Sequence, residues 1–222
     1  MQSKSNIAAF FDFDETLVSV NSSKIGFKWL YDHGMLSKLF IIKVMIAVFL
    51  NRRNIISEKQ MADVMISFYK NRKLADFKAG ADEFYFEHLK PHLSPKIIEK
   101  LEFHRENGHI LVIASGSIRY YLEPVAKDLG IHHLICTDLE ENSNGLLTGK
   151  AKGKVCIGDY KKELAIKLAD KLDIDLDNSF AYGDNQADIP LLKLVGNPVA
   201  VEPTPTLKKV AQRNNWQILN YN

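Results

Sequence analysis

The stretch IAAFFDFDET, residues 7–16, determines how the rest of the chain is interpreted. Its apolar half, followed by acidic residues, predicts a short buried strand of a parallel sheet that ends in a polar loop. A second apolar run, HILVIAS at residues 109–115, follows a helix that we expect to begin near Ser94. From there to the end of the chain, short apolar runs alternate with helical stripes. This alternation predicts an α/β fold, a mostly parallel sheet covered by helices.

One interval breaks the alternation. Roughly 90 residues separate Thr16 from the second strand, whereas two strands and their crossover helix need only about 30. The interval has a helical pattern, with Ser57 and Gln60 spaced as a capping box ahead of an apolar stripe. We expect a core of residues 1–17 and 91–222, and an inserted all-helical cap of residues 18–90 over the edge of the sheet that binds ligands.

The composition excludes several classes of protein. With 222 residues, of which 46% are hydrophobic and 25% charged, the chain is neither disordered nor fibrous. The net charge of +2 gives no footprint for nucleic acid, which we do not expect as a partner. Cys136 and Cys156 form neither a disulfide framework nor a zinc pattern, and the chain opens without a signal-peptide core. We therefore expect a cytoplasmic protein.

Polar side chains recur where the predicted strands end. Asp12 and Asp14 alone carry little weight, because DIDLDN at residues 173–178 repeats their spacing twice. Other strand ends, however, add Ser115 with Gly116 and Asp184 with Asp188, and Lys161 opens a later helix. Carboxylates from two neighbouring strands can share one hard cation that prefers oxygen ligands, and we expect Mg²⁺.

In this order, DFDET, IASGS, Lys161 and GDNQAD, with a helical insertion after the first motif, resemble the haloacid dehalogenase (HAD) superfamily phosphatases. The resemblance is greatest to subfamily IB, which includes phosphoserine phosphatase, and runs from about Ile7 to Leu219. It implies a Rossmann-like core with the first motif on the central strand. It also implies Mg²⁺-dependent hydrolysis of a phosphomonoester through an aspartyl-phosphate.

The resemblance also implies roles for single residues. Asp12 is the expected nucleophile, Asp14 the general acid and base, and Lys161 the cation that offsets the charge of Asp12. The expected substrate-binding set is Thr16, Asn21, Ser115 and Gly116, and the expected metal-binding set is Asp12, Asp14 through its backbone carbonyl, Asp184 and Asp188.

Some assignments keep alternatives. Lys162 competes with Lys161, and GDYKKE at residues 158–163 imitates the GDNQAD motif, although we reject it because it begins a helical stripe. Ser115 can also serve as a helix cap. A non-catalytic binding protein on the same fold is the alternative to an enzyme.

The apolar segment LFIIKVMIAVFL, residues 39–50, has two interpretations. It is either a helix buried in the cap or in a dimer, or a helix that meets a membrane interface or a lipid tail. The substrate is correspondingly a small metabolite or a lipid phosphate. Phosphoserine phosphatases carry a glutamate nine residues after the nucleophile, where this chain has Asn21, so we expect phosphoserine not to be the best substrate.

Overall fold

A parallel six-stranded sheet forms the centre of the molecule in a computed structural model, which describes residues 6–221. The strand order is β3-β2-β1-β6-β7-β8, and every neighbouring pair runs parallel. The predicted α/β, Rossmann-like fold is confirmed. The strands are β1 (Ala8–Phe11), β2 (Ile110–Ile118), β3 (His133–Thr137), β6 (Phe180–Gly183), β7 (Asn197–Val201) and β8 (Gln217–Leu219).

β1 lies inside the sheet and is buried on both faces. Its four residues are fully inaccessible to solvent, as expected for an unbroken apolar strand in a parallel sheet. Phe11 is paired with Ile113 of β2 on one side and with Tyr182 of β6 on the other. The Asp12 N–H extends this pairing by donating to the Tyr182 carbonyl over 2.9 Å. The residue after β1 is therefore fixed by the central strands.

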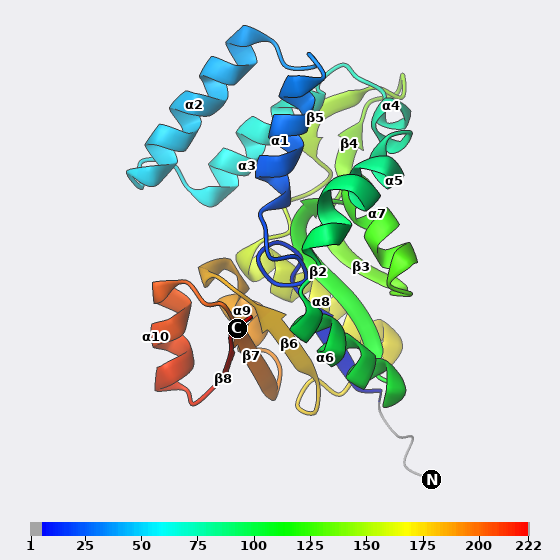
Figure 1. Cartoon of the computed structure of the whole chain (residues 1–222), viewed down its shortest axis with the longest axis vertical. Coiled ribbons are helices and arrows are strands. Elements are labelled where there is room, and N and C mark those ends of the chain that lie inside the picture. The colour runs from blue at the N-terminus through cyan, green and yellow to red at the C-terminus, as the bar shows by residue number, and fades with distance from the viewer. Residues whose placement is uncertain (1–5, 222) are drawn as a thin grey trace.

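Helices cover both faces of the sheet (Figure 1). Phe11 belongs to the core on one face, with Leu101 and Leu122, and Phe10 to the core on the other, with Ala165 and Leu207. This alternation follows from the two-residue period of a strand. The helices are α6 (Pro95–Glu106), α7 (Arg119–Asp128), α8 (Gly158–Leu172), α9 (Ile189–Leu192) and α10 (Pro205–Arg213).

The chain between β1 and β2 forms the helical cap, which stands above the sheet in Figure 1. The predicted capping box is present, with Ser57 Oγ accepting from the Gln60 N–H and the Gln60 side chain accepting from the Ser57 N–H. The bounds of the cap domain, residues 18 and 90, remain a prediction. The elements are α1 (Ser22–Asp32), α2 (Lys38–Arg52), α3 (Glu58–Ile66), α4 (Leu74–Lys78), α5 (Ala81–Phe84) and the short turns η1 (Ser67–Tyr69), η2 (Tyr85–Leu89) and η3 (Lys90–His92).

A small antiparallel hairpin, which the sequence did not predict, packs against this cap. It consists of β4 (Leu139–Glu141) and β5 (Leu147–Ala151), and it is separate from the six-stranded sheet. Leu147 is fully buried in one cluster with Phe68, and its N–H donates to the Arg72 carbonyl over 2.8 Å. A segment that follows β3 in the chain therefore supports the cap helices.

Candidate active site

Three carboxylates meet where β1 and β6 end. Asp12 directly follows β1, Asp184 directly follows β6, and Asp188 lies one short helical turn later, in η4 (Gln186–Asp188). Each offers an oxygen that lies within 4.8 Å of the other two. Their side chains are almost inaccessible, with residue exposures of 5%, 2% and 1%. The two neighbouring strands bring these residues together as the sequence predicted.

Lys161 supplies a buried cation to this cluster. Its Nζ donates to Oδ1 of Asp12 over 2.8 Å and to Oδ1 of Asp188 over 2.6 Å. The side chain begins in the first turn of α8, and the residue is 2% exposed. Lys162 is half-buried and does not line the cavity that adjoins the cluster. Of the two adjacent lysines, the structure therefore places Lys161 in the site.

The cluster has more negative than positive charge. Burial raises the pKa of Asp12 to about 7, with Asp188 adding to the effect and the Lys161 ammonium opposing it. Burial, together with the charges of Asp12 and Asp188, raises the pKa of Asp184 to about 8. A further cation among these oxygens would favour their ionised forms. The donor set, buried oxygens with a deficit of positive charge, fits a hard divalent ion such as Mg²⁺.

The loop after β6 orients Asp188 and leaves Asp184 freer. Oδ2 of Asp188 accepts from the backbone N–H groups of Asp184 and Asn185, over 3.2 and 3.3 Å. With Lys161 on Oδ1, both oxygens of Asp188 are engaged. Asp184 accepts one side-chain bond, from Nδ2 of Asn185 to Oδ1 over 2.8 Å. A Cβ on Gly183 would lie 2.6 Å from Cβ of Asp188, so this loop requires glycine there.

Asp14 lies beside the cluster and holds two parts of the chain together. Its Oδ1 accepts the N–H of Ser22, the first residue of α1, and its Oδ2 accepts the Ser117 hydroxyl over 2.8 Å. The Asp14 carboxylate is outside the three-carboxylate cluster. The sequence did not predict Ser22 or the side chain of Ser117 as site residues. The sequence signal that points to Ser117 as a site residue is its position in the IASGS motif.

Ser115 and Gly116 line the same cavity from within the C-terminal part of β2, which continues to Ile118. Ser115 is 2% exposed, and its Oγ accepts the N–H of Ser117 over 3.1 Å. A Cβ on Gly116 would lie 2.9 Å from Cγ2 of Ile157, so a larger residue would collide with the loop before α8. Both residues are placed where the sequence predicted a phosphate-binding segment.

Thr16 and Asn21, two of the residues predicted to bind substrate, differ in where the structure places them. Thr16 is fully buried and does not line the cavity, and its hydroxyl has no hydrogen-bond partner among residues 6–221. Asn21 does line the cavity, but its Oδ1 accepts from the Lys24 N–H over 3.1 Å and caps α1. Asp159 of the rejected GDYKKE motif is exposed and outside the carboxylate cluster.

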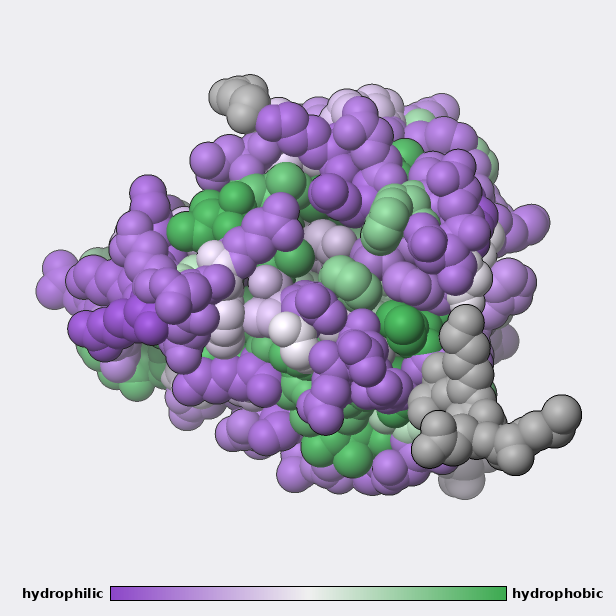
Figure 2. All heavy atoms as spheres, turned by 90° about the horizontal axis from the view of Figure 1, so that it is seen from below, coloured by the Kyte–Doolittle hydropathy of each residue, from purple (hydrophilic) through white to green (hydrophobic). Residues whose placement is uncertain are grey.

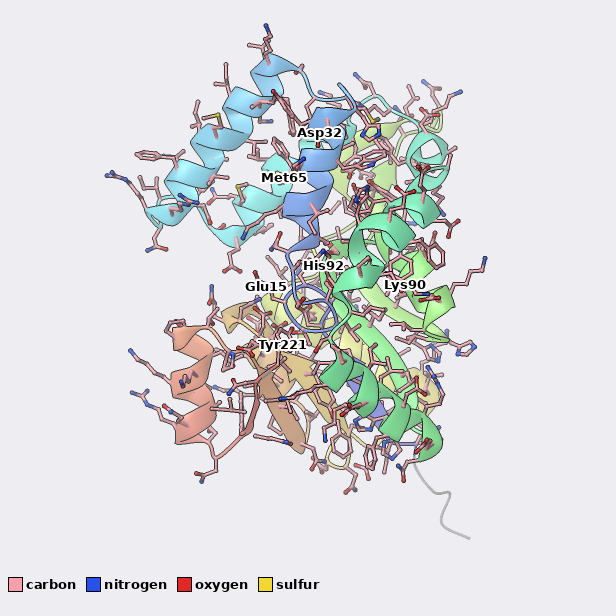
Figure 3. All side chains as sticks on the ribbon, in the orientation of Figure 1. Glu15, Asp32, Met65, Lys90, His92 and Tyr221 are labelled. Carbon is pink, nitrogen blue, oxygen red and sulfur yellow. The ribbon has the colours of Figure 1, made fainter. Side chains whose placement is uncertain are left out.

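A cavity of about 970 Å³ extends from the carboxylates into the cap. Figure 3 shows Met65 on α3 above Glu15 in the loop after β1, and both residues line this cavity. The end at the sheet is polar, whereas the end in the cap is mainly apolar, with Asn51, Arg52 and Glu58 among its polar lining residues. The apolar wall comes mainly from α2 and α3, and includes Phe40, Val44, Met45, Val48, Phe49, Met61 and Met65.

The fold and the site correspond to a known family. Residues 9–193, most of the chain, match the family described as haloacid dehalogenase-like hydrolase. The chain therefore belongs to that family, as its motifs predicted, and it is an HAD-type phosphatase.

Relatives cover nearly the whole chain at low identity. The histidinol-phosphatase of Neisseria meningitidis serogroup C (strain 8013) is 28% identical over 223 residues, covering 96% of this chain and 98% of that one. A protein of unknown function from Bordetella pertussis Tohama I has a TM-score of 0.88 at 23% identity, covering 99% and 100% of the two chains. A phospho-aspartyl intermediate analogue of phosphoserine phosphatase has a TM-score of 0.70 at 20% identity, covering 99% and 95%. The two solved structures show that the fold is shared.

Proposed function

We propose that the protein is a Mg²⁺-dependent phosphomonoesterase that forms an aspartyl-phosphate on Asp12. The observation that carries the proposal is the buried cluster of Asp12, Asp184 and Asp188 around Lys161, at the floor of a cavity. Family membership and the names of the relatives support the same chemistry. A non-catalytic role would leave the cost of burying these charges without a function.

In the first half-reaction, an Asp12 carboxylate oxygen attacks phosphorus and the bond from phosphorus to the ester oxygen breaks. Asp14 gives its proton to the leaving alkoxide, so an alcohol departs. In the second half-reaction, Asp14 takes a proton from water, whose oxygen attacks phosphorus. The bond from phosphorus to Asp12 then breaks, which releases inorganic phosphate and restores the carboxylate.

The other site residues would bind the metal or stabilise the negative charge of the phosphoryl group. Asp12 and Asp184 through their side chains, and Asp14 through its backbone carbonyl, would bind Mg²⁺, with Asp188 as support. When bound, Mg²⁺ supplies positive charge that stabilises the phosphoryl oxygens during transfer. Lys161 offsets the charge of Asp12, and Ser115 with the amides near Gly116 would hydrogen-bond the phosphoryl group.

The cavity favours a substrate with an apolar portion over phosphoserine. The side-chain carbonyl of Asn21 already accepts the Lys24 N–H as the N-cap of α1. Arg72, an arginine of the cap, packs its guanidinium 4.0 Å from the centre of the Phe68 ring and donates to the Met35 carbonyl. It does not line the cavity. In contrast, each methylene of a ligand that is buried against the apolar wall strengthens its binding by about 0.8 kcal/mol.

The test is hydrolysis of p-nitrophenyl phosphate by the purified protein with Mg²⁺, with EDTA, and with Mg²⁺ restored after EDTA. We expect turnover only when Mg²⁺ is present. Absence of turnover across a panel of aryl, polyol, amino-alcohol and lipid phosphates would favour the binding protein. Undiminished turnover after exhaustive chelation would contradict the role of the metal. The cytoplasmic location stays a prediction.

A further inference from the structure

Helix α2 has two apolar faces, of which one is exposed. Phe40, Val44 and Val48 on its inner side line the cavity. Leu39, Ile42, Ile46 and Phe49 follow one another at intervals of three or four residues and therefore share the opposite side. These four are 80%, 53%, 55% and 54% exposed. We call this set, with the 65%-exposed Met45 beside it, the outer face.

The outer face concentrates the exposed apolar surface of the molecule. Within residues 6–221, nine large hydrophobic residues are strongly exposed, and five of them lie on α2. Figure 1 shows this helix at the outer edge of the cap, and Figure 2 shows that the opposite end of the molecule is covered mainly by hydrophilic residues. A contiguous apolar surface of this kind is typical of an interaction site.

The charges carried by α2 and its C-terminal cap residue have one sign. Lys38 and Arg53 stand at its two ends, at helical positions that share its side, and Arg53 places its guanidinium 4.6 Å above the Phe49 ring. The remaining lysine of the helix, Lys43, points elsewhere and donates to the Ser67 hydroxyl. The α2 sequence KLFIIKVMIAVFLNR contains no acidic residue. An apolar centre with cationic ends complements an anionic lipid surface.

The same charges disfavour a second copy of the chain as the occupant. A two-fold symmetric pairing of antiparallel α2 helices would place Lys38 of each copy near Arg53 of the other. Like charges would then meet at both ends, and the helix has no carboxylate to pair with them.

The outer face is also continuous with the cavity. Met45 and Phe49 are more than half exposed and also line the cavity wall. With 15 residues, α2 is about 22 Å long. No helix within the described residues is long and apolar enough to cross a membrane. An apolar helix with these properties is suited to lie in the plane of the interface.

We infer that the outer face of α2 docks the protein on the surface of an anionic bilayer. The docking itself does not depend on catalysis. One consequence does rest on the proposed function: a lipid with a phosphomonoester headgroup would enter the cavity beside Met45 and Phe49 without crossing water.

The experiment is co-sedimentation of the full chain with vesicles of phosphatidylcholine alone and of phosphatidylcholine with 30% phosphatidylglycerol. We expect binding to the mixed vesicles that is at least 10-fold weaker for the Ile42→Ser/Ile46→Ser variant. The Lys38→Gln/Arg53→Gln variant should lose the preference for anionic vesicles. The matched control, Phe86→Ser/Phe103→Ser, removes two similarly exposed apolar residues that lie outside α2, with exposures of 49% and 50%, and should bind like the wild type.

Two further measurements separate the alternatives. Ile42 and Ile46 lie outside the cavity wall, so hydrolysis of p-nitrophenyl phosphate by their variant should be unchanged, which also reports that it is folded. Sedimentation velocity would reveal a dimer that the variant loses, and this result would overturn the inference in favour of a second copy. Equal vesicle binding by variant and wild type, or none by the wild type, would also overturn it. Vesicle binding without any hydrolysis would refute the proposed function and leave the docking intact.

Discussion

Nζ of Lys161 lies 2.6 Å from Oδ1 of Asp188, and both side chains are almost fully buried. The same ammonium donates to Asp12, so one cation from α8 contacts the residues that follow two different strands. A buried charge is tolerated when its partner is present and becomes strongly destabilising when the partner is removed. This pair therefore links the stability of the site to its electrostatics.

Lys161→Met should lower kcat/KM at least 100-fold, because it leaves the Asp12 and Asp188 carboxylates without their cation while nearly keeping the length of the side chain. It should also lower the melting temperature measured without metal. Lys162→Met is the matched control and should change both quantities little. Steady-state kinetics and thermal unfolding check this, and equal effects of the two variants would contradict the role of Lys161.

Asp12→Asn should lower hydrolysis by at least about 10³-fold, since an amide does not attack phosphorus at a useful rate. The change is nearly isosteric, so the circular dichroism spectrum should match that of the wild type. Turnover near the wild-type rate, in a preparation free of contaminating phosphatase, would remove Asp12 from the role of nucleophile.

Asp184→Ala should raise the Mg²⁺ concentration for half-maximal activity more than Asp188→Ala does. Asp188 has both oxygens engaged by the protein, whereas Asp184 accepts a single side-chain bond. Titration of activity with Mg²⁺ after EDTA treatment measures the difference. The reverse order would make Asp188 the direct ligand.

Phosphoserine should have a lower kcat/KM than a phosphomonoester with an apolar chain. The panel is phosphoserine, histidinol phosphate, glycerol phosphate and lysophosphatidic acids of increasing chain length, all at concentrations below micelle formation. We expect KM to fall as the chain lengthens, because each buried methylene adds about 0.8 kcal/mol. Phosphoserine ahead of the others, at about 10⁴ M⁻¹s⁻¹ or more, would refute the proposed substrate class.

The buried His104 should contribute a loss of stability as the pH falls from about 6.5 to 4, whereas Asp12 and Asp184, whose pKa values are raised in the folded protein, contribute in the opposite direction. His104 is fully buried, with Nε2 lying 2.8 Å from the Tyr182 hydroxyl and Nδ1 lying 2.8 Å from Nδ1 of His109. Burial, with contributions from His109 and Lys100, lowers the pKa of His104 to about 4. Between the two pKa values the unfolded chain binds a proton that the folded protein refuses, so acid favours unfolding.

Urea unfolding at pH 7 and pH 5 measures this effect. His104→Gln, whose side chain can keep the contact with Tyr182, should have an unfolding free energy that falls less, or rises more, from pH 7 to pH 5 than that of the wild type. An unchanged difference would assign the acid sensitivity to other groups.

The family, the fold and the residues of the carboxylate cluster could be predicted from the sequence, because the carboxyl ends of parallel strands meet at one edge of the sheet. The polar residues after β1 and β6, and those in the C-terminal part of β2, therefore meet, although more than 160 residues separate Asp12 from Asp184. The hairpin of β4 and β5 could not be predicted in this way. Its strands have three and five residues with mixed polarity, and the buried surface around Leu147 comes from distant cap residues.

Side-chain partners were the least predictable part of the site. Asn21 occupies the position that the resemblance indicated, yet the first turn of α1 competes for its carbonyl oxygen. The bond from Ser117 to Asp14 spans 103 residues and has no local pattern. Likewise, the apolar run at residues 39–50 predicted a helix with two interpretations, and only its packing distinguishes the inner wall from the outer face.

The position of β1 in the sheet has a consequence for synthesis. Its partner β6 ends at Gly183, so about 170 residues must follow before the strand can pair on both edges. At 5–20 residues per second, the ribosome needs roughly 10 to 35 s for that length. For most of this time Phe10 and Phe11, which are fully buried in the finished protein, are outside the ribosomal exit tunnel but cannot yet pair with β6. The nascent chain therefore exposes an apolar segment that a chaperone can bind, well before the active site has formed.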